Sequence, residues 1–206
     1  MRKHAFVVGE YYHIYNRGTD KRQIFLDQED LDRFIKSLIE FNRIKPIGSL
    51  YEMQFSPKKK TLVKSQKLVS IIAFCLNPNH FHLILTPLTD GGIEKFMQKI
   101  AGYTRYFNEK YERSGVLFQG KFQSKHIDNN DYLLRVSSYV NLNNRDPLGT
   151  SSTKWSKSSW EEYLGKEVGI CDIDIILKQF KKIDEYRTFA LECWNYSQEL
   201  KEELDK

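Results

Sequence analysis

The segment Cys75–Leu85 (CLNPNHFHLIL) contains the turn and the alternating strand from which the fold can be predicted. The run that leads into it, Leu68–Pro78, is almost entirely apolar and is predicted to be a buried strand. The Asn-Pro-Asn sequence ends this strand, and His80–Pro87 forms a second one. Because so short a turn separates them, we expect the two strands to pair in antiparallel fashion.

Working outward, apolar spacing and turn signals predict five more elements. In chain order they are a strand at Tyr11–Gly18, a helix from Asp27 to about Asn42, a helix face from Ile93 to Phe107, a strand at Gly115–Asp128 that bends at Gly120, and a helix at Asp131–Asn144. The order β-α-β-β-α-β-α predicts an α+β fold, with a small antiparallel sheet and helices on one face.

We divide the chain into three parts by composition. Residues 1–149 are predicted to form the main domain, 150–165 a linker and closing segment, and 166–206 a helical, acidic extension. Within the main domain, Lys45–Lys67 is the most loop-like stretch, and Pro57–Lys67 holds five lysines and no acidic residue. This stretch is either a DNA-contacting loop or an insertion without such a role.

Composition limits the class of protein. With 206 residues, 40% of them hydrophobic, the chain can build one sizeable core. No apolar stretch approaches the ~20 residues that a membrane span needs, and the basic start lacks a signal-peptide core. Three widely spaced cysteines, Cys75, Cys171 and Cys193, indicate no disulfide framework. We therefore expect a cytoplasmic protein.

Charge is divided unevenly along the chain. Residues 161–206 carry a net charge of −5, whereas residues 1–160 carry +10. A basic body indicates a polyanionic partner, most often nucleic acid, although a solvated basic surface gives the same count.

His80 and His82 are the first candidate site residues. Side chains alternate along a strand, so both histidines project from one face while Phe81 projects from the other. Two imidazoles at this spacing can reach one divalent ion, although such a pair also arises by chance. The helix at Asp131–Asn144 adds Tyr139, a candidate nucleophile, and Asn143 one turn later, a candidate oxygen ligand.

Taken in order, these segments resemble a known family. The stretch YYHIYNRGTDKRQIF is similar to that family's opening strand, and CLNPNHFHLIL to its strand with paired histidines. YTRYFNEKYERSGVLFQGKFQSKHI, YLLRVSSYVNLN and WSKSSWEEYLG are similar to its later segments. The family is the single-tyrosine HUH transposases, in particular the REP-associated tyrosine transposases and their insertion-sequence relatives. The resemblance runs from about Tyr11 to Gly165.

The resemblance implies a ferredoxin-like HUH endonuclease fold over residues 1–149. It also implies a metal-dependent endonuclease and strand transferase that cuts single-stranded DNA beside hairpins. His80, His82 and Asn143 match the ligands of a Mg²⁺ or Mn²⁺ ion, and Tyr139 matches the nucleophile that forms a 5′-phosphotyrosine link. Tyr132 matches a position usually taken as structural. The chain departs from the family where Asn144 replaces a common proline after Asn143.

The same resemblance implies a hairpin or single-stranded DNA partner, no membrane, a place near the nucleoid, and a monomer or homodimer. We expect DNA contacts from basic and aromatic side chains near the site. The candidates are Arg17, Arg105, Lys121, Lys125, Phe118 and Phe122.

Two other functions remain open from the sequence. A domesticated nucleic-acid-binding protein would keep this fold without cleaving DNA, although it would not need all four site residues. A metal-dependent hydrolase of small molecules would need more ligands, and no acidic residue lies between His80 and Leu88.

Overall fold

The computed structural model describes residues 5–45, 48, 50, 66–146 and 153–204. Most of the predicted Lys45–Lys67 loop lies outside these residues, as does the predicted boundary at residues 149 and 150. Among the helices that the structure describes, none is long and apolar enough to cross a membrane.

Five antiparallel strands form one sheet in the order β4-β1-β3-β2-β5. Their bounds are β1 Tyr11–Arg17, β2 Val69–Asn77, β3 His80–Pro87, β4 Gln123–Ile127 and β5 Lys157–Ser158. The first four, with helices after β1 and β3, have the connectivity of the ferredoxin-like motif. The predicted α+β class and antiparallel sheet are confirmed.

The central hairpin sets the register of the site. Pro78 and Asn79 form the turn, so that Asn77 pairs with His80 and Cys75 with His82. Backbone amides of the segment after β1 donate to the turn, with Gly18 N 2.8 Å from Asn79 O. The tight antiparallel pair predicted from the sequence is therefore present.

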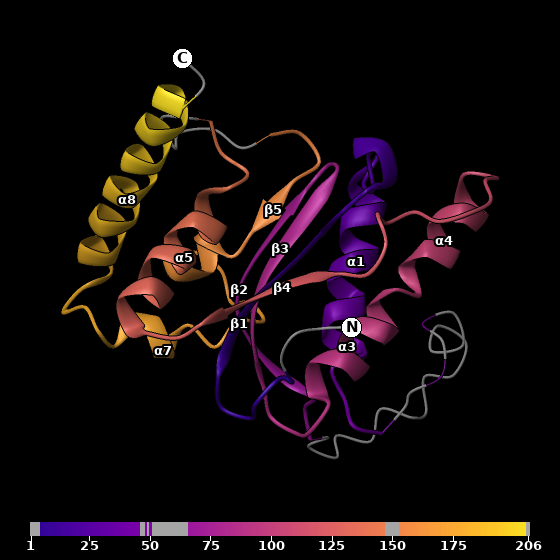
Figure 1. The fold of residues 1–206 in the computed structure, drawn as a ribbon, viewed down its shortest axis with the longest axis horizontal. Helices are drawn as coiled ribbons and strands as arrows, with labels where there is room; N and C mark the ends of the chain where they lie inside the picture. Colours follow the sequence, from indigo (N-terminus) through magenta and orange to yellow (C-terminus); the bar gives the residue numbers. More distant parts are fainter. Residues whose placement is uncertain (1–4, 46–47, 49, 51–65, 147–152, 205–206) are drawn as a thin grey trace.

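One face of the sheet is covered by α1 Gln28–Glu40, α3 Gly92–Ile100 and α4 Tyr103–Lys110 (Figure 1). Asp27 caps α1 by accepting a hydrogen bond from Asp30 N, as the acidic start of this segment predicted. The single helix face expected from Ile93 to Phe107 is interrupted at Ala101 and Gly102, where the structure forms two helices joined by a turn.

The other face is covered by α5 Asn130–Leu142 and α8 Ile183–Leu204, with the short helices α6 Trp160–Tyr163 and α7 Asp174–Leu177 beside them (Figure 1). The prediction of helices on one face is thus wrong in this detail. The reason lies in β2, where Phe74 and Leu76 enter one core while Ala73 and Cys75 enter the other. A strand that is apolar on both faces needs cover on both.

The predicted strand at Gly115–Asp128 is shorter than expected, because regular pairing with β1 begins only at Gln123. The preceding segment still contacts β1 through an isolated bridge between Gly18 and Phe118. Between the two, Gly120 adopts a φ of 67°, which suits glycine and produces the bend expected there.

Candidate active site

The two histidines of β3 lie on the sheet face that α5 covers. Their rings are half-buried, and their centroids are 5.1 Å apart. Phe81 between them is buried in the opposite core, as the alternation predicted. The strand therefore directs both imidazoles towards α5, the helix that carries Tyr139.

Helix α5 brings the other two candidates to these histidines. Asn129 caps its N-terminus by accepting a hydrogen bond from Tyr132 N at 2.8 Å. At the other end, the Tyr139 ring meets His82 edge-on at 5.6 Å between centroids. Asn143 Oδ1 lies 3.1 Å from His80 Nε2. All four predicted site residues are thus neighbours, while their chemical roles stay predictions.

The contacts of His80 determine which of its nitrogens is free of hydrogen. Nδ1 lies 2.6 Å from Asn79 Oδ1, which accepts, whereas Nε2 lies 3.0 Å from Asn77 Nδ2, which donates, so the surroundings suit a hydrogen on Nδ1 and a lone pair on Nε2. Burial is the main cause that lowers the pKa of His80, which favours the neutral ring. The neutral ring therefore places the lone pair of Nε2 beside Oδ1 of Asn143, and both atoms face the amide group of Asn77.

Two such acceptors side by side form a suitable site for a cation. Asn77 Nδ2 lies 3.0 Å from His80 Nε2 and 2.8 Å from Asn143 Oδ1, so one amide group faces both. Neighbouring ligands of an octahedral ion with bonds of about 2.1 Å are about 3 Å apart. The spacing of 3.1 Å between Nε2 and Oδ1 fits this requirement.

The candidate metal site is poor in charged ligands. Within the ranges that the structure describes, no group of three or more His, Cys, Asp or Glu residues is placed to hold a metal. The candidate site therefore depends on the amide oxygen of Asn143 together with His80 and His82. Imidazole ligands suit transition-metal ions, whereas the amide oxygen also suits Mg²⁺ and Mn²⁺.

Tyr139 lies in a mostly aromatic environment. Besides His82, its ring is 6.3 Å from the ring of His13 and 6.5 Å from that of Trp194 on α8. Burial raises the pKa of Tyr139, and hydrogen bonding to Asn143 opposes this effect. The phenol is therefore neutral at neutral pH, and it must lose its proton if it is to attack a phosphate.

His13 is a site neighbour that the sequence analysis missed. It lies on β1, and its Nε2 is 2.8 Å from Nδ1 of His82. Burial, followed by the charge of Lys125, lowers the pKa of His13 to about 4. Strand alternation in the sequence could have indicated the face on which His13 lies. Tyr11, His13 and Tyr15 share one face of β1, opposite to the buried Tyr12 and Ile14.

Comparison with known proteins identifies the family. A family model described as "Transposase IS200 like" matches residues 7–143. The chain belongs to this family of IS200-like transposases. The match covers the sheet strands β1 to β4 and ends at Asn143, and it confirms the resemblance seen in the sequence. No curated protein matches the chain.

A solved structure supports the fold of this IS200-like transposase. A REP-associated tyrosine transposase bound to a REP hairpin matches 84% of this chain and 89% of its own, with a TM-score of 0.51 and 16% identity. A putative transposase from Deinococcus radiodurans matches 68% of this chain and 95% of its own at 16% identity. Its TM-score is 0.37.

The predicted DNA contacts of the IS200-like chain lie in three places. Arg17 and Lys125 belong to the site face, because they are the register partners of His80 and His13. Both side chains are exposed, and the Lys125 amine lies 4.8 Å from the centre of the Tyr132 ring. These two are the candidates that the fold brings near the site.

The other four candidates lie elsewhere. Phe118, Lys121 and Phe122 line a groove of about 1240 Å³ that also contains Tyr12, on the opposite side of the sheet. Phe118 packs edge-on against the buried Phe81, with ring centroids 5.8 Å apart.

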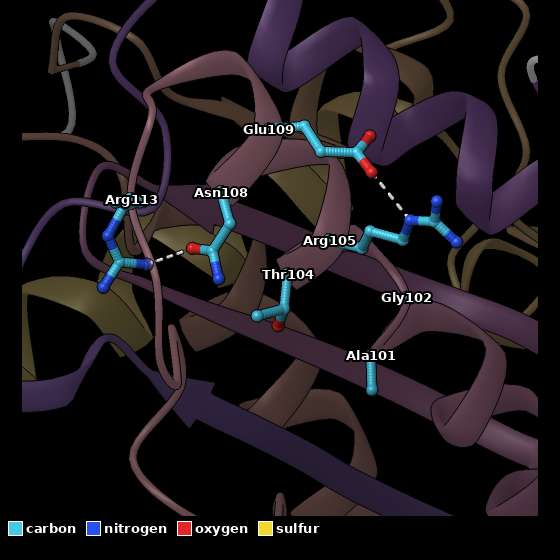
Figure 2. Close-up of a pocket in the computed structure, with 7 residues that line it drawn as sticks. All are labelled: Ala101, Gly102, Thr104, Arg105, Asn108, Glu109 and Arg113. Carbon is cyan, nitrogen blue, oxygen red and sulfur yellow. Dashed lines mark hydrogen bonds and ion pairs between the residues drawn. The ribbon is translucent and has the colours of Figure 1, made fainter.

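Arg105 projects from α4 beside a shallow hollow and forms an ion pair of 2.7 Å with Glu109 (Figure 2). Since α4 covers the face opposite to α5, Arg105 is also remote from the four site residues.

Proposed function

We propose that this IS200-like transposase is a metal-dependent endonuclease and strand transferase that acts on single-stranded DNA. The observation that carries the proposal is the joint position of two α5 residues. Tyr139 contacts His82, and Asn143 one turn later lies 3.1 Å from His80, so the candidate nucleophile and the candidate ligands are neighbours within one chain.

In the proposed first step, the phenolic oxygen of Tyr139 attacks the scissile phosphorus. The bond from phosphorus to the 3′ oxygen breaks, and the 5′ phosphate remains on Tyr139 as a phosphodiester. The phenolic proton passes to water, and the released 3′ oxygen takes up a proton. A divalent ion held by His80, His82 and Asn143 would make the phosphate easier to attack by drawing charge from its oxygens.

In the second step, a 3′ hydroxyl of another DNA end attacks the phosphotyrosine bond and releases Tyr139. One phosphodiester replaces another in each step, so no nucleotide cofactor is needed. Helix α5 holds Tyr139 beside His82 throughout, because its buried side chains Leu133, Val136 and Val140 fix it to the sheet.

The proposed substrate is a DNA hairpin with single-stranded flanks. Three observations support it: the net charge of +10 over residues 1–160, the exposed Arg17 and Lys125 on the site face, and the REP hairpin held by the similar solved structure. Since one chain supplies Tyr139 and both histidines, we further propose that a monomer can carry out cleavage.

The main test uses Tyr139→Phe with Tyr132→Phe as a matched control on the same helix. A labelled hairpin with single-stranded flanks is incubated with Mn²⁺, and covalent adducts are separated under denaturing conditions. We expect adducts with the wild type and with Tyr132→Phe, none with Tyr139→Phe, and none when EDTA removes the metal.

An adduct on Tyr139→Phe would show that another residue is the nucleophile, and Tyr132 would be examined next. Tight hairpin binding in EDTA, together with an absence of cleavage in every divalent metal, would instead identify a non-cleaving nucleic-acid-binding protein. One observation favours this second function. Asn77 forms hydrogen bonds to His80 and Asn143, and these bonds satisfy both candidate ligands without a metal.

A further inference from the structure

The contact between His13 and His82 joins two strands directly beside the candidate metal site. Their rings are 5.0 Å apart between centroids and inclined by 25°, with Nε2 of His13 2.8 Å from Nδ1 of His82. Nearly parallel rings whose nitrogens approach this closely meet edge to edge, in the geometry of a hydrogen bond rather than of stacked faces.

Only one hydrogen fits between these two nitrogens. The nitrogen to which it is bonded determines whether Nε2 of His82 has a lone pair that could bind a metal. If Nε2 of His13 donates, Nδ1 of His82 is bare, and the neutral His82 ring must carry its hydrogen on Nε2. If Nδ1 of His82 donates, the neutral ring has no hydrogen on Nε2, which keeps its lone pair. Only the second arrangement leaves a metal-binding lone pair on the side of His82 that faces away from His13.

We propose that His13 is a positioning residue that accepts the hydrogen of Nδ1 in His82 and thereby keeps Nε2 of His82 available as a ligand. The inference rests on the metal site of the proposed function. Metal-bound histidines usually donate their second nitrogen to such an outer partner, which fixes the ring orientation and raises ligand basicity.

The surroundings of His13 suit this role. Strand β1 lies between β3 and β4, so its backbone is hydrogen-bonded on both sides and supplies a rigid support. The His13 ring also lies 5.0 Å from the ring of Tyr15 and 6.3 Å from that of Tyr139. These contacts hold the ring at the angle that its hydrogen bond to His82 requires.

His80 has an equivalent outer partner. With its hydrogen on Nδ1, it donates to Asn79 Oδ1 at 2.6 Å and keeps a lone pair on Nε2, beside Asn143 and Asn77. With His13 as acceptor, both candidate ligands use Nδ1 for orientation and keep Nε2 for the ion. The two histidines then have the same tautomer, although one outer partner is a neighbouring turn residue and the other lies 69 residues away in sequence.

The test compares His13→Phe, which keeps an aromatic ring but cannot accept, with His13→Gln, whose amide oxygen can. His126→Phe is the matched control, because His126 lies on β4, where its ring packs against Tyr12 on the opposite sheet face. Mn²⁺ affinity is measured by electron paramagnetic resonance in the absence of DNA, and the hydrogen on His82 is located by nitrogen-15 NMR in the metal-free protein.

We expect His13→Phe to weaken Mn²⁺ binding by about 10–100-fold, the usual effect of losing an outer partner. His13→Gln should remain within a few-fold of the wild type, and His126→Phe should match it. In the wild type, NMR should place the hydrogen on Nδ1 of His82. Unfolding curves show whether each variant keeps the wild-type stability.

Wild-type Mn²⁺ affinity in His13→Phe would overturn the inference, as would a hydrogen on Nε2 of His82 or an equal loss of affinity in His13→Phe and His13→Gln. A wild type that bound no Mn²⁺ would overturn the inference together with the metal site. If the expected Mn²⁺ pattern appeared while the wild type formed no Tyr139 adduct, the inference would stand and the proposed function would fail.

Discussion

At the scale of single residues, Asn143 links the candidate metal ligands to the candidate nucleophile. It forms the C-terminal cap of α5, so its position follows directly from where the helix ends. Its Oδ1 lies 3.1 Å from His80 Nε2, and its hydrogen bonding opposes the effect of burial on the pKa of Tyr139. One side chain therefore serves both parts of the proposed reaction.

Replacing Asn143 with alanine should therefore weaken two measured properties. Mn²⁺ affinity should fall by at least about tenfold, since even outer partners of a metal change affinity by that factor. Formation of the Tyr139 adduct should fall as well. Asn130→Ala is the control, because Asn130 is exposed at the start of α5 and bonds to Gln179. An Asn143→Ala protein with unchanged Mn²⁺ affinity would exclude Asn143 as a ligand.

The sequence predicted His80 and His82 but not His13, and the difference is physical. Strand alternation is a local property, so a pair two residues apart can be placed on one face from the sequence alone. The partner of His82 lies 69 residues away, and the contact depends on the pairing of β1 with β3. That register is fixed by the assembled sheet, which no local pattern in β1 specifies.

At the scale of elements, α8 holds α5 through buried polar groups. The Tyr186 hydroxyl accepts a hydrogen bond of 2.8 Å from Asn141 Nδ2, and Ser159 Oγ donates to Asn141 Oδ1. Trp194 on the same helix donates from Nε1 to Asp146 O at 3.2 Å, just beyond the end of α5. These bonds fix the helix that carries Tyr139, so the C-terminal helix contributes to the position of the candidate nucleophile.

Tyr186→Phe should lower the stability of the protein and slow the formation of the Tyr139 adduct. The phenylalanine leaves Asn141 Nδ2 without its buried acceptor, which costs about 1–3 kcal/mol in the free energy of unfolding. Looser packing of α5 should also slow adduct formation, while Mn²⁺ affinity changes less. Urea unfolding and the adduct assay measure the two effects, with Tyr196→Phe as control because Tyr196 is 62% exposed on the same helix. Equal stability of both variants would contradict this account.

Elements were predicted well where the pattern was local and less well where packing determined the outcome. The bounds of β3 match the prediction, because its alternating start at His80–Leu83 leads into an apolar run that ends at Pro87. The single helix expected across Ala101 and Gly102 became two, since apolar spacing alone does not register the turn there. The cover on both faces of β2 was implied by its continuous apolar run, a signal that the sequence analysis used only to infer burial.

At the scale of the whole molecule, charge and fold together define a candidate path for DNA. The basic excess belongs to residues 1–160, which contain the sheet and its histidines, whereas the segment that includes α8 is acidic. Of the predicted basic contacts, Arg17 and Lys125 extend from the site face, while Arg105 projects from α4 on the other layer. Under the proposed function, a DNA strand that reaches Tyr139 must cross the site face.

Hairpin binding should therefore depend on Arg17 and Lys125 and be insensitive to Arg105. Each phosphate contact that is lost releases about one counterion fewer, so Arg17→Ala and Lys125→Ala should each reduce the slope of log affinity against log salt by about 1. Fluorescence anisotropy with a labelled hairpin in EDTA measures binding without cleavage. Lys178→Ala controls for the loss of a surface charge, because Lys178 pairs with Asp174 in the acidic segment. If Arg105→Ala lowered the slope while Arg17→Ala and Lys125→Ala did not, the DNA would run across α4, and a substrate bound there could reach Tyr139 only by passing around the edge of the sheet.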